Sequence, residues 1–328
     1  MGSPPGAIVT SEFVYETAAF PSAHASTIVE TPDGLAAAWF GGTAEGNPDV
    51  GIWVSHRAGG RWSPPVEIAD GVQPDGRRLP CWNPVLFQSG AGPLLLFYKV
   101  GPSPATWWGL LRTSADHGLT WSTARRLPDG ILGPIRAKPV ELGDGTLLAG
   151  SSTEHAGWVV HVERTRDPLG AWLSTGPLND AAAWSAIQPT ILDHGGGRVQ
   201  LLCRSRQGVV TQAWSGDHGV TWSPMIATTL PNPSAGIDAV RLRDGRFLLL
   251  YNPSASGRQH LAVAVSCDGL AWAPPVTLEE GPGELSYPAA IQARDGLVHV
   301  TYTWRRQRIK HAVIDPVRLG GCPAPGQP

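Results

Sequence analysis

Six polar residues recur along the chain at matching points of a repeated pattern. Each is followed at once by Ala or Pro and then by a short apolar strand, and they stand 49 to 59 residues apart: His24, Asn83, Lys138, Gln188, Asp238 and Tyr287. Packing alone would favour one residue type at such a position, so six different polar groups indicate a site. An imidazole, a phenol, an amine and a carboxylate could bind an oxygen-rich ligand and transfer protons.

The elements around these residues repeat as well. Each strand leads through a glycine turn, such as Asp144-Gly145 or Asp244-Gly245, into a second apolar strand and then a third, alternating strand. A Trp ends the next turn in five units, 34 to 38 residues after the opening residue: Trp62, Trp121, Trp172, Trp222 and Trp272. Six such units predict one all-β domain over residues 1–328, a six-bladed β-propeller with four antiparallel strands per blade.

The sixth unit lacks a fourth strand at the C-terminus. An alternating segment near the N-terminus, at residues 13–17, can supply it. We therefore expect the N-terminal strand, at about residues 12–18, to complete the last blade and close the ring, which removes exposed sheet edges.

In a propeller the innermost strands begin around one central mouth, so the six opening residues should face one another. Residues at the ends of the second strands or the starts of the third strands should surround them: Glu45, Asp49, Lys99, Glu154, Arg204, Arg206, Arg258, Arg305 and Arg306. Trp82, Trp107, Trp108, Trp158 and Trp304 also lie at strand ends, where a sugar face could stack. This mixture predicts a small, polar and anionic ligand such as a sugar acid.

Composition and charge limit the range of functions. The chain has 25 Lys and Arg against 27 Asp and Glu, so no global field favours nucleic acid or an anionic membrane. No apolar run is long enough to span a bilayer, and no signal peptide is visible, which predicts a cytoplasmic protein unless a signal was removed. Cys81, Cys203, Cys267 and Cys322 are far apart and predict reduced thiols. We expect no metal, no cofactor, and a monomer or weak oligomer.

Three turns between third and fourth strands share a motif. Residues 114–121 and 215–222 read S-x-D-x-G-x-T-W, and residues 266–272 are a shortened copy. This motif resembles the Asp-box, or BNR, repeat of the sialidase superfamily, and the resemblance covers essentially the whole chain. Its Asp and Ser oxygens accept turn N–H groups and its Trp packs between sheets, so Asp116, Asp217 and Asp268 are expected to be structural.

The resemblance implies roles for some of the residues at the mouth. Tyr287 matches the family's tyrosine nucleophile, and Asp49 matches its aspartate acid/base. Arg204 or Arg206, with Arg258, resemble the arginines that bind the substrate carboxylate. Two positions depart from the family: Gln188 stands where a glutamate activates the tyrosine, and Ala19-Phe20-Pro21 replaces the first-blade Arg-Ile-Pro motif.

Several functions stay open from the sequence. The leading prediction is an exo-acting carbohydrate-active enzyme that hydrolyses a terminal glycosidic bond of an acidic glycan, with Tyr287, Asp49, His24 and Glu45 in the chemistry. Sialidase-like propellers also remove rhamnose from rhamnosyl-glucuronate ends, and β-elimination there would need a base such as Tyr287 or His24 with cations at the carboxylate. A non-catalytic sugar-binding propeller and a cytoplasmic biosynthetic enzyme on a small metabolite also remain compatible with the sequence.

Overall fold

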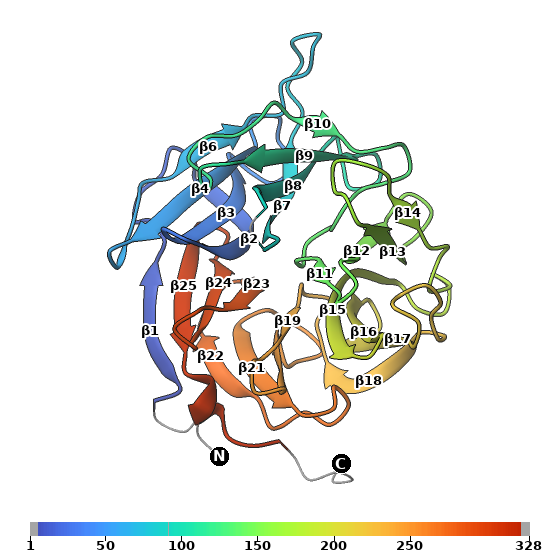
Figure 1. Ribbon diagram of the computed structural model, residues 1–328. Helices are drawn as coiled ribbons and strands as arrows, with labels where there is room; N and C mark the ends of the chain where they lie inside the picture. Colours follow the sequence, from blue (N-terminus) through green and yellow to red (C-terminus); the bar gives the residue numbers. More distant parts are fainter. Residues whose placement is uncertain (1–5, 91, 323–328) are drawn as a thin grey trace.

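The computed structural model describes residues 6–90 and 92–322. Six sheets surround a central axis, and the inner strands β2, β7, β11, β15, β19 and β23 lie nearest the centre (Figure 1). The predicted six-bladed β-propeller of four-stranded antiparallel blades is confirmed. No helix within the described ranges is long and apolar enough to cross a membrane.

The first three blades follow one another along the chain. Blade 1 contains β2 (Ser22–Thr31), β3 (Gly34–Gly42), β4 (Gly51–Ala58), β5 (Arg61–Trp62) and β6 (Val66–Ala69), which also pairs with β4. Blade 2 contains β7 (Cys81–Gln88), β8 (Leu94–Val100), β9 (Trp108–Ser114) and β10 (Arg125–Arg126). Blade 3 contains β11 (Val140–Glu141), β12 (Leu147–Thr153), β13 (Val159–Thr165) and β14 (Leu173–Ser174).

The remaining blades complete the ring. Blade 4 contains β15 (Ala186–Gly195), β16 (Arg198–Ser205), β17 (Val209–Ser215) and β18 (Ile226–Pro231). Blade 5 contains β19 (Asp238–Arg241), β20 (Phe247–Tyr251), β21 (His260–Ser266) and β22 (Val276–Glu280). Blade 6 contains β23 (Leu285–Gln292), β24 (Val298–Trp304), β25 (Arg308–Ile314) and the N-terminal strand β1 (Ile8–Phe13).

The N-terminal strand closes blade 6 as predicted, but it begins earlier than expected. β1 pairs with β25 over residues 8–13, and only the N–H of Val14 continues toward that strand, donating to Ile309 O at 2.9 Å. Val14 and Tyr15 are instead buried in a core cluster with Trp39. Burial of these side chains moves the ladder upstream of the predicted segment.

Four inner strands have a β-bulge near their start, which changes the direction of one side chain in each strand. The register of the ladder shifts in β2, β7, β15 and β23, and the bulged residues Ala25, Asn83, Gln188 and Tyr287 have φ of 54°, 39°, 57° and 53°. The equivalent position in blade 1 is therefore Ala25 and not His24, as the repeat predicted. The polar residue misled the prediction, because a bulge is fixed by backbone geometry and not by side-chain polarity.

The two complete Asp-boxes have the structural role expected of them. In the copy at residues 215–222, Ser215 Oγ donates to Asp217 Oδ1 at 2.8 Å and accepts from Gly219 N at 2.9 Å, and Trp222 Nε1 donates to Gly219 O at 3.1 Å. The copy at residues 114–121 repeats these bonds. The hydrogen bonds that Asp217 accepts lower the pKa of its carboxyl to about 2, as expected for a fixed turn residue.

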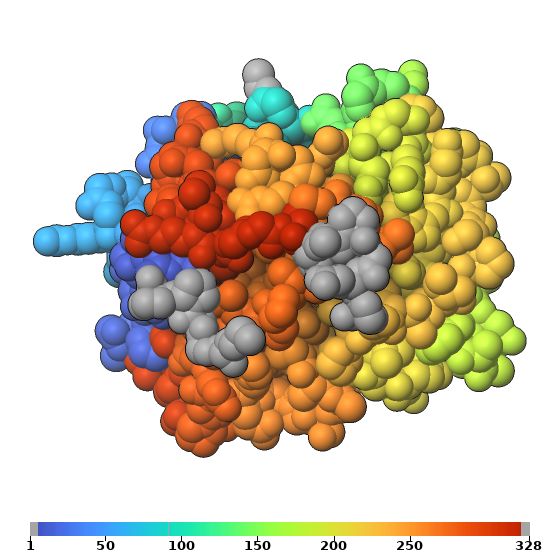
Figure 2. Space-filling view, turned by 90° about the horizontal axis from the view of Figure 1, so that it is seen from below, coloured from blue at the N-terminus to red at the C-terminus, as the bar shows by residue number. Residues whose placement is uncertain are grey.

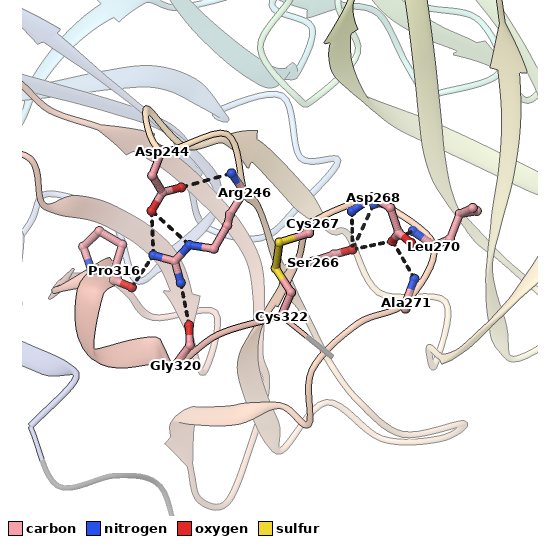
Figure 3. Close-up of a disulfide and its surroundings, with 11 residues drawn as sticks. Asp244, Arg246, Ser266, Cys267, Asp268, Leu270, Ala271, Pro316, Gly320 and Cys322 are labelled. Atoms are coloured by element: carbon pink, nitrogen blue, oxygen red, sulfur yellow. Dashed lines mark hydrogen bonds and ion pairs between the residues drawn. A yellow bond between two sulfur atoms is a disulfide. The ribbon is translucent and has the colours of Figure 1, made fainter. Parts of the chain in front are cut away.

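The C-terminal segment is fastened to blade 5. After β25 a short 3-10 helix, η1 (Pro316–Leu319), lies across that blade, as the red segment in Figure 2 shows. Arg246 donates to the carbonyls of Pro316 and Gly320 at 2.8 and 2.6 Å, and Cys322 forms a disulfide with Cys267 (Figure 3). The prediction of four reduced thiols is therefore wrong for this pair, because the fold joins cysteines 55 residues apart.

Candidate active site

Three guanidinium groups surround the ring of Tyr287. The Cζ atoms of Arg136, Arg204 and Arg258 lie 5.2, 5.5 and 5.9 Å from the ring centre. Arg136 and Arg204 are buried, so their charges act in a poorly solvated environment. The sequence predicted Arg204 and Arg258 at this mouth but missed Arg136.

Backbone carbonyls hold these arginines in place. Arg204 Nη1 and Arg258 Nη2 both donate to Ser234 O, at 2.7 and 2.9 Å, and Arg136 Nη1 donates to Ile237 O at 2.7 Å. Ser234 and Ile237 belong to the loop between β18 and β19. A Cβ on Gly236 of the same loop would lie 2.9 Å from Arg136 Nε and 3.1 Å from the Tyr287 ring. The loop therefore requires glycine there to approach the cluster.

Glu284 forms ion pairs with Arg258 and with a further arginine, Arg306. Its carboxylate accepts from Arg258 Nη1 at 2.8 Å, from Arg306 Nε at 2.7 Å and from Ser286 Oγ at 2.6 Å. Burial alone would raise the pKa of Glu284, but electrostatic interactions with His24 and Arg306, together with the Ser286 hydroxyl, lower it to about 2. Glu284 is thus charged at neutral pH.

His24 packs against Tyr287 without a hydrogen bond of its own. The two ring centres are 4.1 Å apart, and both imidazole nitrogens are buried without a partner among the described residues. Burial and the charge of Arg306 hold the pKa of His24 well below 6.5. His24 is therefore neutral at pH 7.

Several buried polar atoms near the mouth have no hydrogen-bond partner among the described residues. Buried polar groups are normally hydrogen-bonded, so such a group indicates a ligand or water site. In the described ranges the unpartnered atoms include both nitrogens of His24, Arg136 Nε, Lys138 Nζ, Gln188 Oε1 and Arg204 Nε. Together they offer donors to an anion and acceptors to hydroxyl groups, which suits a sugar acid.

Asp49 and Glu45 lie on one loop between β3 and β4. Both oxygens of Asp49 accept hydrogen bonds from Thr43, from its N–H and its hydroxyl, each at 2.8 Å. Glu45 forms an ion pair with Arg306, which links this loop to blade 6. Asp49 therefore orders the loop, and Glu45 holds it next to the arginine cluster.

Lys138 and Asp238 form an ion pair at the start of their strands. Lys138 Nζ is 3.7 Å from Asp238 Oδ2. Asp238 also accepts from Ala290 N at 2.8 Å and from Thr190 Oγ1 at 3.2 Å, so each of its carboxylate oxygens has a hydrogen-bond partner. This pair lies beneath the mouth, near Arg136, and stabilises the inner strands.

Trp158 stands between two arginines at the rim. Arg204 Cζ and Arg206 Cζ lie 5.0 and 4.1 Å from its ring centre. Glu154, just after the end of β12, is close to the same groups. Burial raises the pKa of Glu154, and the charge of Arg204 only partly offsets this.

The structure turns several other predicted site residues away from the mouth. Lys99 is fully buried and donates to Pro134 O between blades 2 and 3, where burial lowers its pKa to about 7. Trp82 packs with Trp107 in the core and leaves little of its ring for a sugar. Arg305 is exposed and lies 4.3 Å from the Trp304 ring, so the neighbouring Arg306 takes the inner position.

Two further predicted site residues, Asn83 and Trp108, differ in how much of the side chain is exposed. Asn83 is buried at its bulge at the start of β7. Trp108, at the start of β9, is half-buried, with Arg126 Cζ 5.2 Å from its ring.

Sequence reasoning missed three contributors to the cluster. These are Arg136, Ser234 and Glu284, which the contacts above bring together, whereas Arg306 was expected near the mouth together with Arg305. Arg136 stands two residues before Lys138 and Glu284 three before Tyr287, so a wider window at each strand start would have included them. Ser234 acts through its carbonyl and gives no signal in the sequence.

The chain belongs to the BNR repeat-like domain family, whose model matches residues 33–300. No curated protein matches it. Among solved structures, it is similar to a protein of unknown function from Dyadobacter fermentans, with 20% identity, a TM-score of 0.77, and coverage of 93% of this chain and 98% of that one.

Sialidases share the same fold. The Hadza microbial sialidase Hz136 is 19% identical with a TM-score of 0.77, and the alignment covers 90% of this chain and 66% of that one. The NanB sialidase of Streptococcus pneumoniae is 12% identical with a TM-score of 0.74, with coverage of 94% and 71%. The chain thus spans about two thirds of the length of these sialidases and is a divergent member of the fold.

Proposed function

We propose that this protein is an exo-acting enzyme that hydrolyses a terminal glycosidic bond of an acidic sugar or glycan. The observation that carries the proposal is the set of three guanidinium groups around Tyr287. Support also comes from the sialidase fold, since the Trypanosoma rangeli sialidase is known in complex with sialic acid. If these arginines bind the carboxylate of a sugar acid, the anomeric carbon of that sugar would lie near the phenol oxygen of Tyr287.

The proposed chemistry assigns each group a step. The Tyr287 oxygen attacks the anomeric carbon while the bond from that carbon to the leaving oxygen breaks, and water later releases the sugar from tyrosine. Gln188 cannot accept the phenol proton. The neutral His24 lies beside the ring but is not hydrogen-bonded to the phenol, so the proton would reach it through a water molecule. Asp49 is the proton donor to the leaving oxygen that the family resemblance implies.

The test is a substrate panel with Tyr287→Phe as the decisive variant. Wild-type protein should release reducing sugar from at least one of a set of sialosides, rhamnosyl-glucuronides and aryl glycosides. Tyr287→Phe should lower kcat/KM roughly 1,000-fold, because it removes the nucleophile. Tyr15→Phe is the matched control, since Tyr15 lies in a separate core cluster. Binding without turnover across the panel would favour a sugar-binding propeller and overturn the proposal.

One observation favours a second candidate, β-elimination at a uronic acid. His24 is unprotonated and packs against Tyr287, so one of the two could act as the base and the other as the acid. The surrounding arginines would neutralise the carboxylate of the uronic acid. A base would remove the proton at C5, the C4–O bond would break, and an unsaturated uronate would form. Its ultraviolet absorbance in the same panel distinguishes elimination from hydrolysis.

A further inference from the structure

Aromatic rings and guanidinium groups alternate from Tyr287 to the rim of the mouth. Arg204 Cζ is 5.5 Å from the Tyr287 ring and 5.0 Å from the Trp158 ring, and Arg206 Cζ is 4.1 Å from Trp158. Tyr287 and Arg204 are each 7% exposed, Trp158 is half-buried and Arg206 is exposed. This ladder therefore leads outward from the arginine cluster to solvent.

The local structure fixes the outer end of the ladder. Arg204 and Arg206 lie two residues apart at the end of β16, and Trp158 immediately precedes β13 of the neighbouring blade. The N–H of Arg206 donates to Ser185 O at 2.9 Å, which anchors its backbone. A guanidinium stacked on indole keeps its N–H edges free for a ligand.

Arg206 is exposed, whereas Arg136 and Arg204, which also lack a carboxylate partner among the described residues, are buried. Arg258 and Arg306 each pair with Glu284, whereas no carboxylate of the described residues lies within 4.0 Å of Arg206. Glu154 is the nearby acid, and it forms no ion pair with Arg206 within 4.0 Å. The rim thus retains a cation that can bind an anion.

We propose that Trp158 and Arg206 form a second subsite that binds a carboxylate on the leaving-group sugar. This inference rests on the proposed function, in which Arg136, Arg204 and Arg258 hold the acid of the released sugar. The preferred substrate would then carry an acidic residue on both sides of the cleaved bond. Arg206 is a specificity residue in this arrangement and takes no part in the bond changes.

The test compares two substrates that share the terminal acidic sugar. In one the leaving sugar is a uronic acid, and in the other it is the matching neutral sugar. Wild-type protein should prefer the acidic leaving group by about tenfold in kcat/KM, mainly through KM, and high salt should reduce the preference. Arg206→Gln should abolish the preference, mainly by raising KM for the acidic substrate toward the KM for the neutral one.

Arg198→Gln is the matched control. Arg198 is also exposed and stacked on an indole, 4.4 Å from Trp214, but it lies at the opposite end of β16. This variant should keep the preference. Equal cleavage of both substrates by wild type, or an unchanged preference in Arg206→Gln, would overturn the subsite.

A binding measurement separates failure of the subsite from failure of the proposed function. If wild type cleaves neither substrate, the proposed function fails, and calorimetry with a monosaccharide uronate and a diuronate disaccharide then decides the subsite. Arg206→Gln should weaken the disaccharide about tenfold and leave the monosaccharide unchanged. Equal affinities of wild type and Arg206→Gln for the disaccharide would contradict the proposed subsite.

Discussion

At the scale of single residues, Glu284 is the group that makes the arginine cluster stable. Arg204 and Arg258 share one carbonyl acceptor, so their like charges are close together. Glu284 pairs with Arg258 and Arg306 and thereby offsets part of this repulsion. Removing one partner of such a network leaves charges that are neither solvated nor paired.

Glu284→Gln should lower the free energy of unfolding by about 2 kcal/mol at pH 7, because two arginines lose an ionic partner. The pKa of Glu284 falls from 4.5 to about 2 on folding, so its contribution is complete above pH 4.5 and is lost as the pH falls toward 2. Urea titrations of both proteins at several pH values should show the difference shrinking over that interval.

The control for this prediction is Glu16→Gln. Glu16 pairs with Arg308 on the surface, with 77% of its side chain exposed, and should change stability little. A Glu284→Gln protein as stable as wild type at pH 7 would contradict the role given to this carboxylate.

At the scale of elements, bulges and Asp-boxes set where side chains point. The bulges at the starts of β7, β15 and β23 place Asn83, Gln188 and Tyr287 at one repeated position. The Asp-boxes fix the opposite end of the blades by satisfying turn N–H groups. Sequence spacing revealed the Asp-boxes, because turn chemistry requires particular residue types, whereas the bulge in blade 1 was assigned to His24 in place of Ala25.

Ser215→Ala should lower the free energy of unfolding by about 1–2 kcal/mol, because the buried N–H of Gly219 loses its acceptor. Thermal or chemical denaturation measures this directly. Ser174→Ala is the comparison, since the exposed Ser174 hydroxyl bonds only to Thr175 O and water can replace it. Equal losses in the two variants would contradict a special role for the box.

At the scale of the whole molecule, both ends of the chain close the ring. Glu12 of β1 accepts from Arg57 Nε of blade 1 at 3.0 Å and is 3.0 Å from His311 Nδ1 of blade 6. The Cys267–Cys322 disulfide fastens the other end to blade 5. Disulfides persist mainly in oxidising compartments, so this bond argues against the cytoplasmic location predicted from the sequence. That location stays a prediction.

Replacing Cys267 and Cys322 by Ser should lower the free energy of unfolding by about 3–4 kcal/mol, since the bond restricts a loop of 55 residues in the unfolded chain. Reductant should destabilise wild type by a similar amount and leave the double variant unchanged. Cys81 and Cys203 are buried, so a thiol assay under denaturing, non-reducing conditions should count two thiols. Four thiols would contradict the disulfide.

The sequence by itself determined the architecture and the approximate position of the site. Turn glycines, Asp-boxes and alternating strands recur because every blade solves the same packing problem, and a repeated solution is visible in one dimension. It also placed Tyr287, His24, Arg204 and Arg258 at the mouth.

Only the tertiary structure decided which charges meet there. Arg136 and Arg306 approach from different blades, and Ser234 acts through its backbone, so no spacing along the chain records their contacts. The same reason hid the disulfide, whose partners are brought together because the segment after β25 folds back onto blade 5.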